Sequence, residues 1–105
     1  MNYRKAIVYS NNQKACVLEE TAKGYKFTYE DDFIKKNVPI SVTLPLRSEP
    51  YESEDLFPFF QGLLPEGWYL EIVASTLKID KEDDYGILLA TCKETIGAIS
   101  IKEII

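Results

Sequence analysis

Alternating apolar and polar residues are frequent in the first half of the chain and predict β-strands. The clearest run is Tyr25, Phe27 and Tyr29, which alternate with polar neighbours as on a strand with one buried face. Asn11 and Asn12 separate two earlier runs, and asparagine tolerates the left-handed conformation of a tight hairpin. The alternation returns once in the middle of the chain and once at its end. We therefore expect strands at about 3–10, 13–20, 24–30, 39–44 and 97–104.

Helix-start residues divide the following part of the chain into three predicted helices. Asp55 is expected to be the N-cap of the first, with Pro58 in its first turn, where a missing N–H costs nothing. Pro65 should stop that helix and take the first position of the second, which ends near Lys78. Asp80 is expected to cap the third. The predicted helical segment is about 56–92, and its third helix is about 81–92.

These elements predict an α+β fold with a mainly antiparallel sheet and the helical segment packed on it. Residues 31–37 are expected to form a short helical turn. Residues 45–54 are polar, contain two prolines and are predicted to be a connection. At 105 residues, the chain is expected to be a single domain, 1–105.

Charge and composition narrow the possible partners. The net charge is −5 and no stretch is rich in Lys or Arg, so direct binding to nucleic acid or to an anionic membrane surface is not expected. The first apolar run is far shorter than the core of a signal peptide, and no apolar stretch approaches the ~18 residues that span a bilayer. A cytoplasmic protein is the expectation.

The sequence contains few residues suited to catalysis. It has no histidine, and Cys16 and Cys92 lack a metal-ligand spacing or a basic partner. The five glycines form no phosphate-binding motif, and the paired carboxylates lie at predicted turns and helix starts. We predict no catalytic residue, no metal site and no cofactor. A small enzyme based on Glu or Cys chemistry is the minor alternative.

Trp68, the only tryptophan, stands out because of its position on the second predicted helix. At 100° per residue it points about 135° from the centre of the apolar face, toward solvent, unless it folds back onto Leu64. An exposed Trp beside a Tyr is typical of residues that dominate binding energy at interfaces. The predicted apolar face consists of Tyr69, Leu70, Ile72, Val73 and Leu77. The predicted partner-binding residues are Trp68, Tyr69, Pro65, Glu66, Gly67 and Glu71.

Several ordered motifs resemble the N-terminal subdomain of HipA-like toxin kinases, and the resemblance covers nearly the whole chain. The most specific motif is "FFxGLLPEG" at its distance from "LPLR" and from a closing "GA". The matching residues are Leu44-Pro45-Leu46-Arg47, Tyr51, Phe59-Phe60, Gly62-Leu63-Leu64-Pro65-Glu66-Gly67, Leu88-Leu89-Ala90 and Gly97-Ala98-Ile99.

The resemblance implies a function without catalysis. In the family this module precedes a kinase domain, and none of the phosphoryl-transfer elements stands in this sequence. A stand-alone copy resembles the HipS-type small antitoxins of split, three-gene HipBST toxin–antitoxin systems. This second resemblance implies that the chain binds and neutralises a HipT-like serine/threonine kinase toxin, with Trp68 reaching the kinase cleft. A HipB-like helix-turn-helix protein would supply DNA binding.

Two alternatives follow from the same resemblance. The chain could be a non-inhibitory subunit that completes a split HipA-like kinase, or a co-repressor that acts with the helix-turn-helix partner. The sequence also departs from the family at two places. Trp68-Tyr69-Leu70 stands where an Arg often follows "LPEG", and residues 91–96 replace a common Gly-x-Asp-Cys turn.

Overall fold

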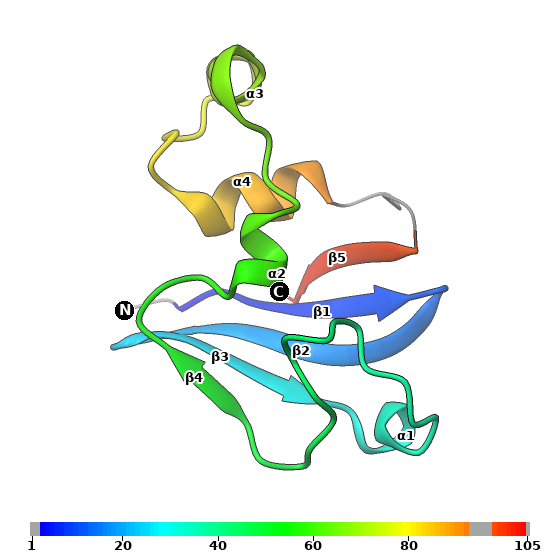
Figure 1. Ribbon diagram of the computed structural model, residues 1–105. Helices are drawn as coiled ribbons and strands as arrows, with labels where there is room; N and C mark the ends of the chain where they lie inside the picture. The colour runs from blue at the N-terminus through cyan, green and yellow to red at the C-terminus, as the bar shows by residue number, and fades with distance from the viewer. Residues whose placement is uncertain (1–2, 93–97, 105) are drawn as a thin grey trace.

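The computed structural model describes residues 3–92 and 98–104, and its centre is a five-stranded antiparallel sheet (Figure 1). The strand order is β4-β3-β2-β1-β5. The strands are β1 Lys5–Ser10, β2 Gln13–Thr21, β3 Gly24–Tyr29, β4 Tyr51–Ser53 and β5 Ile99–Ile104. The helices are α1 Asp31–Ile34, α2 Pro58–Gln61, α3 Gly67–Leu77 and α4 Asp84–Thr91. The predicted α+β class is confirmed.

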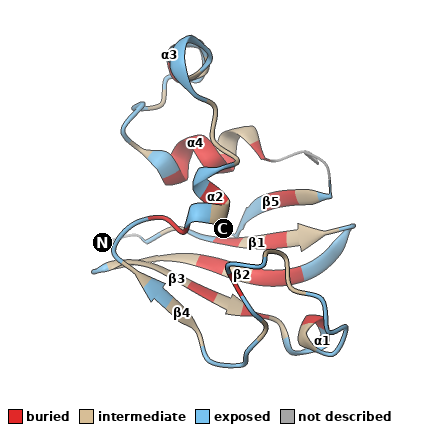
Figure 2. Cartoon of the chain, viewed as in Figure 1, coloured by how far each residue is buried: buried red, intermediate tan, exposed pale blue. Residues whose placement is uncertain are grey.

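The hydrophobic core lies between the sheet and helices α2 and α4 (Figure 2). Phe27 of β3 is its aromatic centre, with ring centroids 4.9 Å from Tyr29, 5.8 Å from Phe60 and 5.9 Å from Phe57. Helix α4 contributes a nearly continuous buried run, Tyr85, Gly86, Ile87, Leu88 and Leu89. Phe59 and Phe60 of the "FFxGLLPEG" motif therefore belong to the core: Phe60 is buried in it and Phe59 packs against it.

Four of the five predicted strands and the first hairpin are confirmed. Asn11 and Asn12 have φ angles of 51° and 65°, the left-handed pair that joins β1 to β2. The register shifts beside Val8, so Ala15 and Cys16 are both buried although they are adjacent in β2. The final strand begins at Ile99, and position 97 of its predicted range lies outside the described residues.

The predicted strand at 39–44 is wrong. Ser41 and Thr43 hydrogen-bond to each other, and the Thr43 and Leu44 N–H groups donate back to Ser41, so this backbone is used in a local turn. The Tyr29 hydroxyl donates to the Leu44 carbonyl, and the Ile40 N–H donates to that hydroxyl at 3.3 Å. Burial raises the pKa of Tyr29 to about 12. This segment is thus held to β3 by the Tyr29 side chain and not by backbone hydrogen bonds between paired strands.

The fourth strand instead forms within the predicted connection, at 51–53. Tyr51 pairs with Phe27, and its hydroxyl donates to the Pro45 carbonyl at 2.6 Å. The Arg47 guanidinium stacks 3.6 Å above the Tyr51 ring and donates to the Pro50 carbonyl at 2.9 Å. The "LPLR" segment and Tyr51 therefore hold one loop together.

The predicted helix starts need three corrections. Phe57, not Asp55, is the N-cap of α2, because Pro58 takes the first helical position. Helix α3 begins at Gly67 rather than at Pro65. Asp83 rather than Asp80 caps α4, since the Asp80 carboxylate accepts the Glu82 N–H at 2.9 Å in the turn before the helix.

Candidate functional site

Helix α3 is the outermost element of the fold. Figure 1 shows it on the far side of α4 from the sheet, so α4 is the support on which it rests. Of its eleven residues only Ala74 is buried. Of the predicted apolar face, Leu70 and Val73 are half-buried, while Tyr69, Ile72 and Leu77 are exposed. The apolar side chains of α3 pack against α4, and much of their surface stays exposed to solvent.

The exposed apolar side chains of α3 begin with Trp68. Its side chain is 75% exposed, and Tyr69, Ile72 and Leu77 are 55%, 50% and 48% exposed. The Trp68 and Tyr69 rings are in edge contact, with centroids 6.2 Å apart and planes at 71°. The predicted outward direction of Trp68 is confirmed. Exposed aromatic surface of this kind is suited to binding another protein.

The other predicted partner-binding residues lie around the start of the same helix. Pro65 is half-buried, while Glu66 and Gly67 are exposed. Gly67 has a φ of 57°, which explains why a glycine stands at the first helical position. Glu71 is exposed and pairs with Lys81 at 2.9 Å. The residues thus share one end of the molecule, although whether they bind a partner stays a prediction.

An apolar groove between α3 and α4 lies beside these residues and was not predicted from the sequence. Its volume is about 340 Å³. No charged side chain lines it; the lining residues are Tyr69, Ile72, Val73, Thr76, Leu77, Ala90 and Thr91. Because it forms between two helices that pack together, no single stretch of sequence contains its signal.

A cluster of charged residues fixes α4, and through it α3. The Arg4 guanidinium donates to the Glu20 carboxylate at 2.7 Å and to the Asp83 carboxylate at 2.7 Å and 2.9 Å. It also lies 5.1 Å from the Tyr85 ring centroid, and the Tyr85 hydroxyl donates to the Leu18 carbonyl at 2.6 Å. Hydrogen bonding by Arg4 lowers the pKa of both carboxyl groups.

These pKa shifts predict acid-sensitive stability. Because the folded-state pKa values are lowered, the stabilisation is present at neutral pH and is lost progressively as the pH falls below about 5. We expect Arg4→Gln to lower the free energy of unfolding at pH 7 by about 1–2 kcal/mol, allowing for partial solvent exposure. The free energy of unfolding of this variant should also depend less steeply on pH. Urea unfolding at several pH values measures both effects.

The matched control is Lys5→Gln, which removes the more exposed pair between Lys5 and Glu19 at 3.2 Å. That variant should change the free energy of unfolding by less than about 0.5 kcal/mol. An Arg4→Gln profile parallel to that of the unsubstituted chain would contradict the role given to Arg4.

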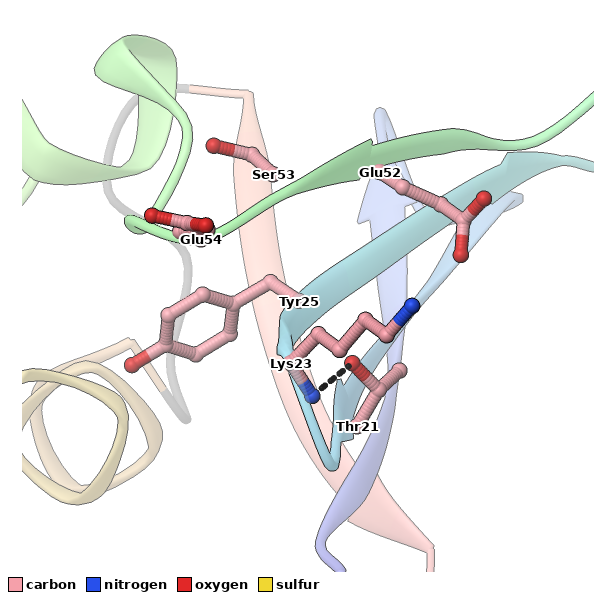
Figure 3. A pocket seen from close by; sticks show the side chains of 6 residues that line it. All are labelled: Thr21, Lys23, Tyr25, Glu52, Ser53 and Glu54. Atoms are coloured by element: carbon pink, nitrogen blue, oxygen red, sulfur yellow. Dashed lines mark hydrogen bonds between the residues drawn. The ribbon is translucent and has the colours of Figure 1, made fainter.

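The remaining candidate sites offer little chemistry. Burial raises the thiol pKa of both Cys16 and Cys92, which disfavours the reactive thiolate. A hollow of about 300 Å³ lies beside β4 and has mostly polar lining residues. Figure 3 shows that the Lys23 side chain there extends toward Glu52. In residues 3–92 and 98–104, no three His, Cys, Asp or Glu side chains are placed to hold a metal ion. No helix in the same residues is long and apolar enough to cross a membrane.

Comparisons with known proteins give one matching family model and two curated relatives. The family model described as the HipA N-terminal domain matches residues 6–102. An uncharacterized protein of Haemophilus influenzae is 34% identical over 87 residues, which are 83% of this chain and 80% of that protein. A candidate kinase of Sinorhizobium fredii is 31% identical over 78 residues, or 74% of this chain but 18% of the kinase.

A solved structure gives the same result. It is described as the N-terminal domain of HipA toxin and has a TM-score of 0.76 and 28% sequence identity. The similarity covers 97% of this chain and 93% of that one.

Proposed function

The chain belongs to the HipA N-terminal domain family, and we propose that it is an antitoxin that binds and neutralises a HipA-like serine/threonine kinase of the HipT type. Its family membership supports a role related to toxin–antitoxin systems. The similarity is to the N-terminal subdomain and not to the kinase catalytic domain. The chain thus corresponds to a small part of the Sinorhizobium relative, and the partner would supply the catalysis.

The observation that carries the proposal is the exposure of Trp68 at the start of α3. An indole exposed to this extent is costly to leave in water, and its burial contributes strongly to binding. Glycine at position 67 and the extended backbone of Glu66 direct the chain outward just before it. We propose that Trp68 and Tyr69, with the Pro65-Glu66-Gly67 turn, reach into or across the catalytic cleft of the kinase.

The acidic charge of the chain is consistent with a division of labour in such a system. At a net charge of −5 it is a poor ligand for DNA. In this proposal a HipB-like helix-turn-helix protein contacts DNA, and the present chain contacts the kinase.

The test is co-expression of the chain with a HipA-like kinase of the same organism, followed by a phosphorylation assay of the kinase with and without the chain. We expect the two proteins to elute as one complex and phosphoryl transfer to fall to background at a stoichiometric ratio. Absence of a complex would overturn the proposal. A complex with unchanged or higher activity would instead identify a subunit that completes the kinase.

A further inference from the structure

Helix α3 is held to the rest of the fold by a small contact. Ala74 is its one buried residue, and the groove of about 340 Å³ leaves part of the contact between α3 and α4 open. In the part of the chain that the structure describes, no hydrogen bond or ion pair joins α3 to α4. Separation of the two helices therefore exposes little additional apolar surface and breaks no polar contact between them.

Both ends of α3 are unfavourable for a helix that lacks tertiary support. Glu66 stands at the N-cap, but its side chain makes no capping hydrogen bond. Lys78 ends the helix in the left-handed conformation with a φ of 56°, a position that favours glycine because a Cβ is crowded there. At eleven residues, α3 is also shorter than the helices that are stable alone in water. Its helical structure therefore depends on the contact with α4.

Helix α4, by contrast, is fixed without help from α3. The Asp83 carboxylate accepts the Gly86 N–H at 3.1 Å and is itself held by Arg4. At the other end, the Cys92 carbonyl accepts the Ile101 N–H of β5 at 2.7 Å. None of these contacts involves α3, and the buried side of α4 belongs to the core beneath it. The sheet and α4 can therefore stay folded when α3 is displaced.

We propose that α3 opens as a unit: it leaves α4 and loses its helical structure while the sheet, α2 and α4 stay folded. The closed arrangement of Figure 1 is the major state, and the open one is a minor state in equilibrium with it. Opening releases Trp68 from its fixed direction and uncovers Ala90 and Thr91 on α4. The α3–α4 contact thus controls how this end of the molecule is presented. The inference concerns the chain alone and does not depend on the proposed function.

The test is amide hydrogen exchange of the purified chain, followed by NMR at several urea concentrations below the unfolding transition. We expect the amides of residues 71–77 to share one protection factor, at least tenfold below those of Leu88 and Leu89 in α4. Their exchange should also depend less steeply on urea, because opening α3 exposes less surface than global unfolding does. Equal protection and equal urea dependence in the two helices would overturn the proposal, since α3 would then open only with the whole fold.

Two variants at one position distinguish opening of the whole helix from fraying of its end. Lys78→Gly relieves the crowding of the left-handed conformation and should slow exchange at all amides of residues 71–77 by about threefold to tenfold, with α4 unchanged. The matched control is Lys78→Ala, which also removes the lysine side chain but keeps a Cβ, and it should not slow exchange. Slowing that Lys78→Gly confines to the last turn of α3, or that both variants produce equally, would overturn the proposal.

Discussion

Replacing Trp68 by alanine is expected to weaken binding to the proposed partner kinase by about 30- to 700-fold. That range corresponds to about 2–4 kcal/mol, the usual loss when a central aromatic residue of an interface is truncated. The side chain is mostly in solvent in the free chain, so its removal should change the free energy of unfolding by less than about 0.5 kcal/mol. Calorimetric titration of the kinase with each variant measures the affinity, and the phosphorylation assay measures relief of inhibition.

Two further variants make the result specific to Trp68. Trp68→Phe keeps an aromatic ring and should bind with intermediate affinity. Val42→Ala removes apolar surface from a side chain that is 92% exposed on a distant loop, and it should bind normally. An unchanged affinity and unchanged inhibition for Trp68→Ala would remove this residue from the binding site, even if the complex itself forms.

Replacing Gly24 by alanine is expected to lower the free energy of unfolding by about 3–5 kcal/mol, or to prevent folding. The φ angle of Gly24 is 144°, which side-chain-bearing residues rarely adopt. A Cβ there would lie 2.2 Å from the Ser53 carbonyl oxygen and 2.6 Å from the Glu54 Cα. Both obstacles are backbone atoms, so β4 would have to separate from β3. Urea unfolding of the purified variant measures the loss.

The matched control is Gly62→Ala. Its added Cβ meets nothing closer than the Phe59 carbonyl oxygen at 3.5 Å, and its backbone is helical. We expect a change of less than about 1 kcal/mol, of either sign. Equal effects of the two substitutions would show that the contact between the β2–β3 turn and β4 does not limit stability.

The sequence was a good guide to the strands with several alternating positions, including β5, which pairs with β1 near the other end of the chain. It was a poor guide in the middle of the chain. The hairpin at Asn11 and Asn12 needed only two residues that accept positive φ. Alternation at 39–44 misled because Ser41 and Thr43 bond the backbone locally, whereas strand pairing requires free N–H and carbonyl groups. The strand at 51–53 is three residues long, too short for a periodic signal.

The candidate site was only partly predictable for a related reason. The outward direction of Trp68 follows from helix periodicity alone, because it depends only on residues of the same helix. The burial of the other side of α3 depends on how much of that side packs against α4, which the sequence of α3 does not contain. In the structure only Ala74 of this helix is buried. The bonds from Arg4 to Asp83 join residues 79 apart in sequence, a pairing for which no local pattern exists.

The pairing of β1 with β5 bears on the order in which the chain folds. Lys5 lies opposite Ile104, so this pair of strands closes nearly the whole chain into a loop, whereas β1, β2 and β3 meet through tight turns. Helix α4 contacts β5, and the Ile101 N–H donates to the Cys92 carbonyl at 2.7 Å. The packing of α4 on β5, which positions α3, is therefore expected to form late in folding. A nascent or partly unfolded chain would have most of its sheet but not a firmly positioned Trp68, so only a fully folded molecule would be ready to bind the kinase proposed above.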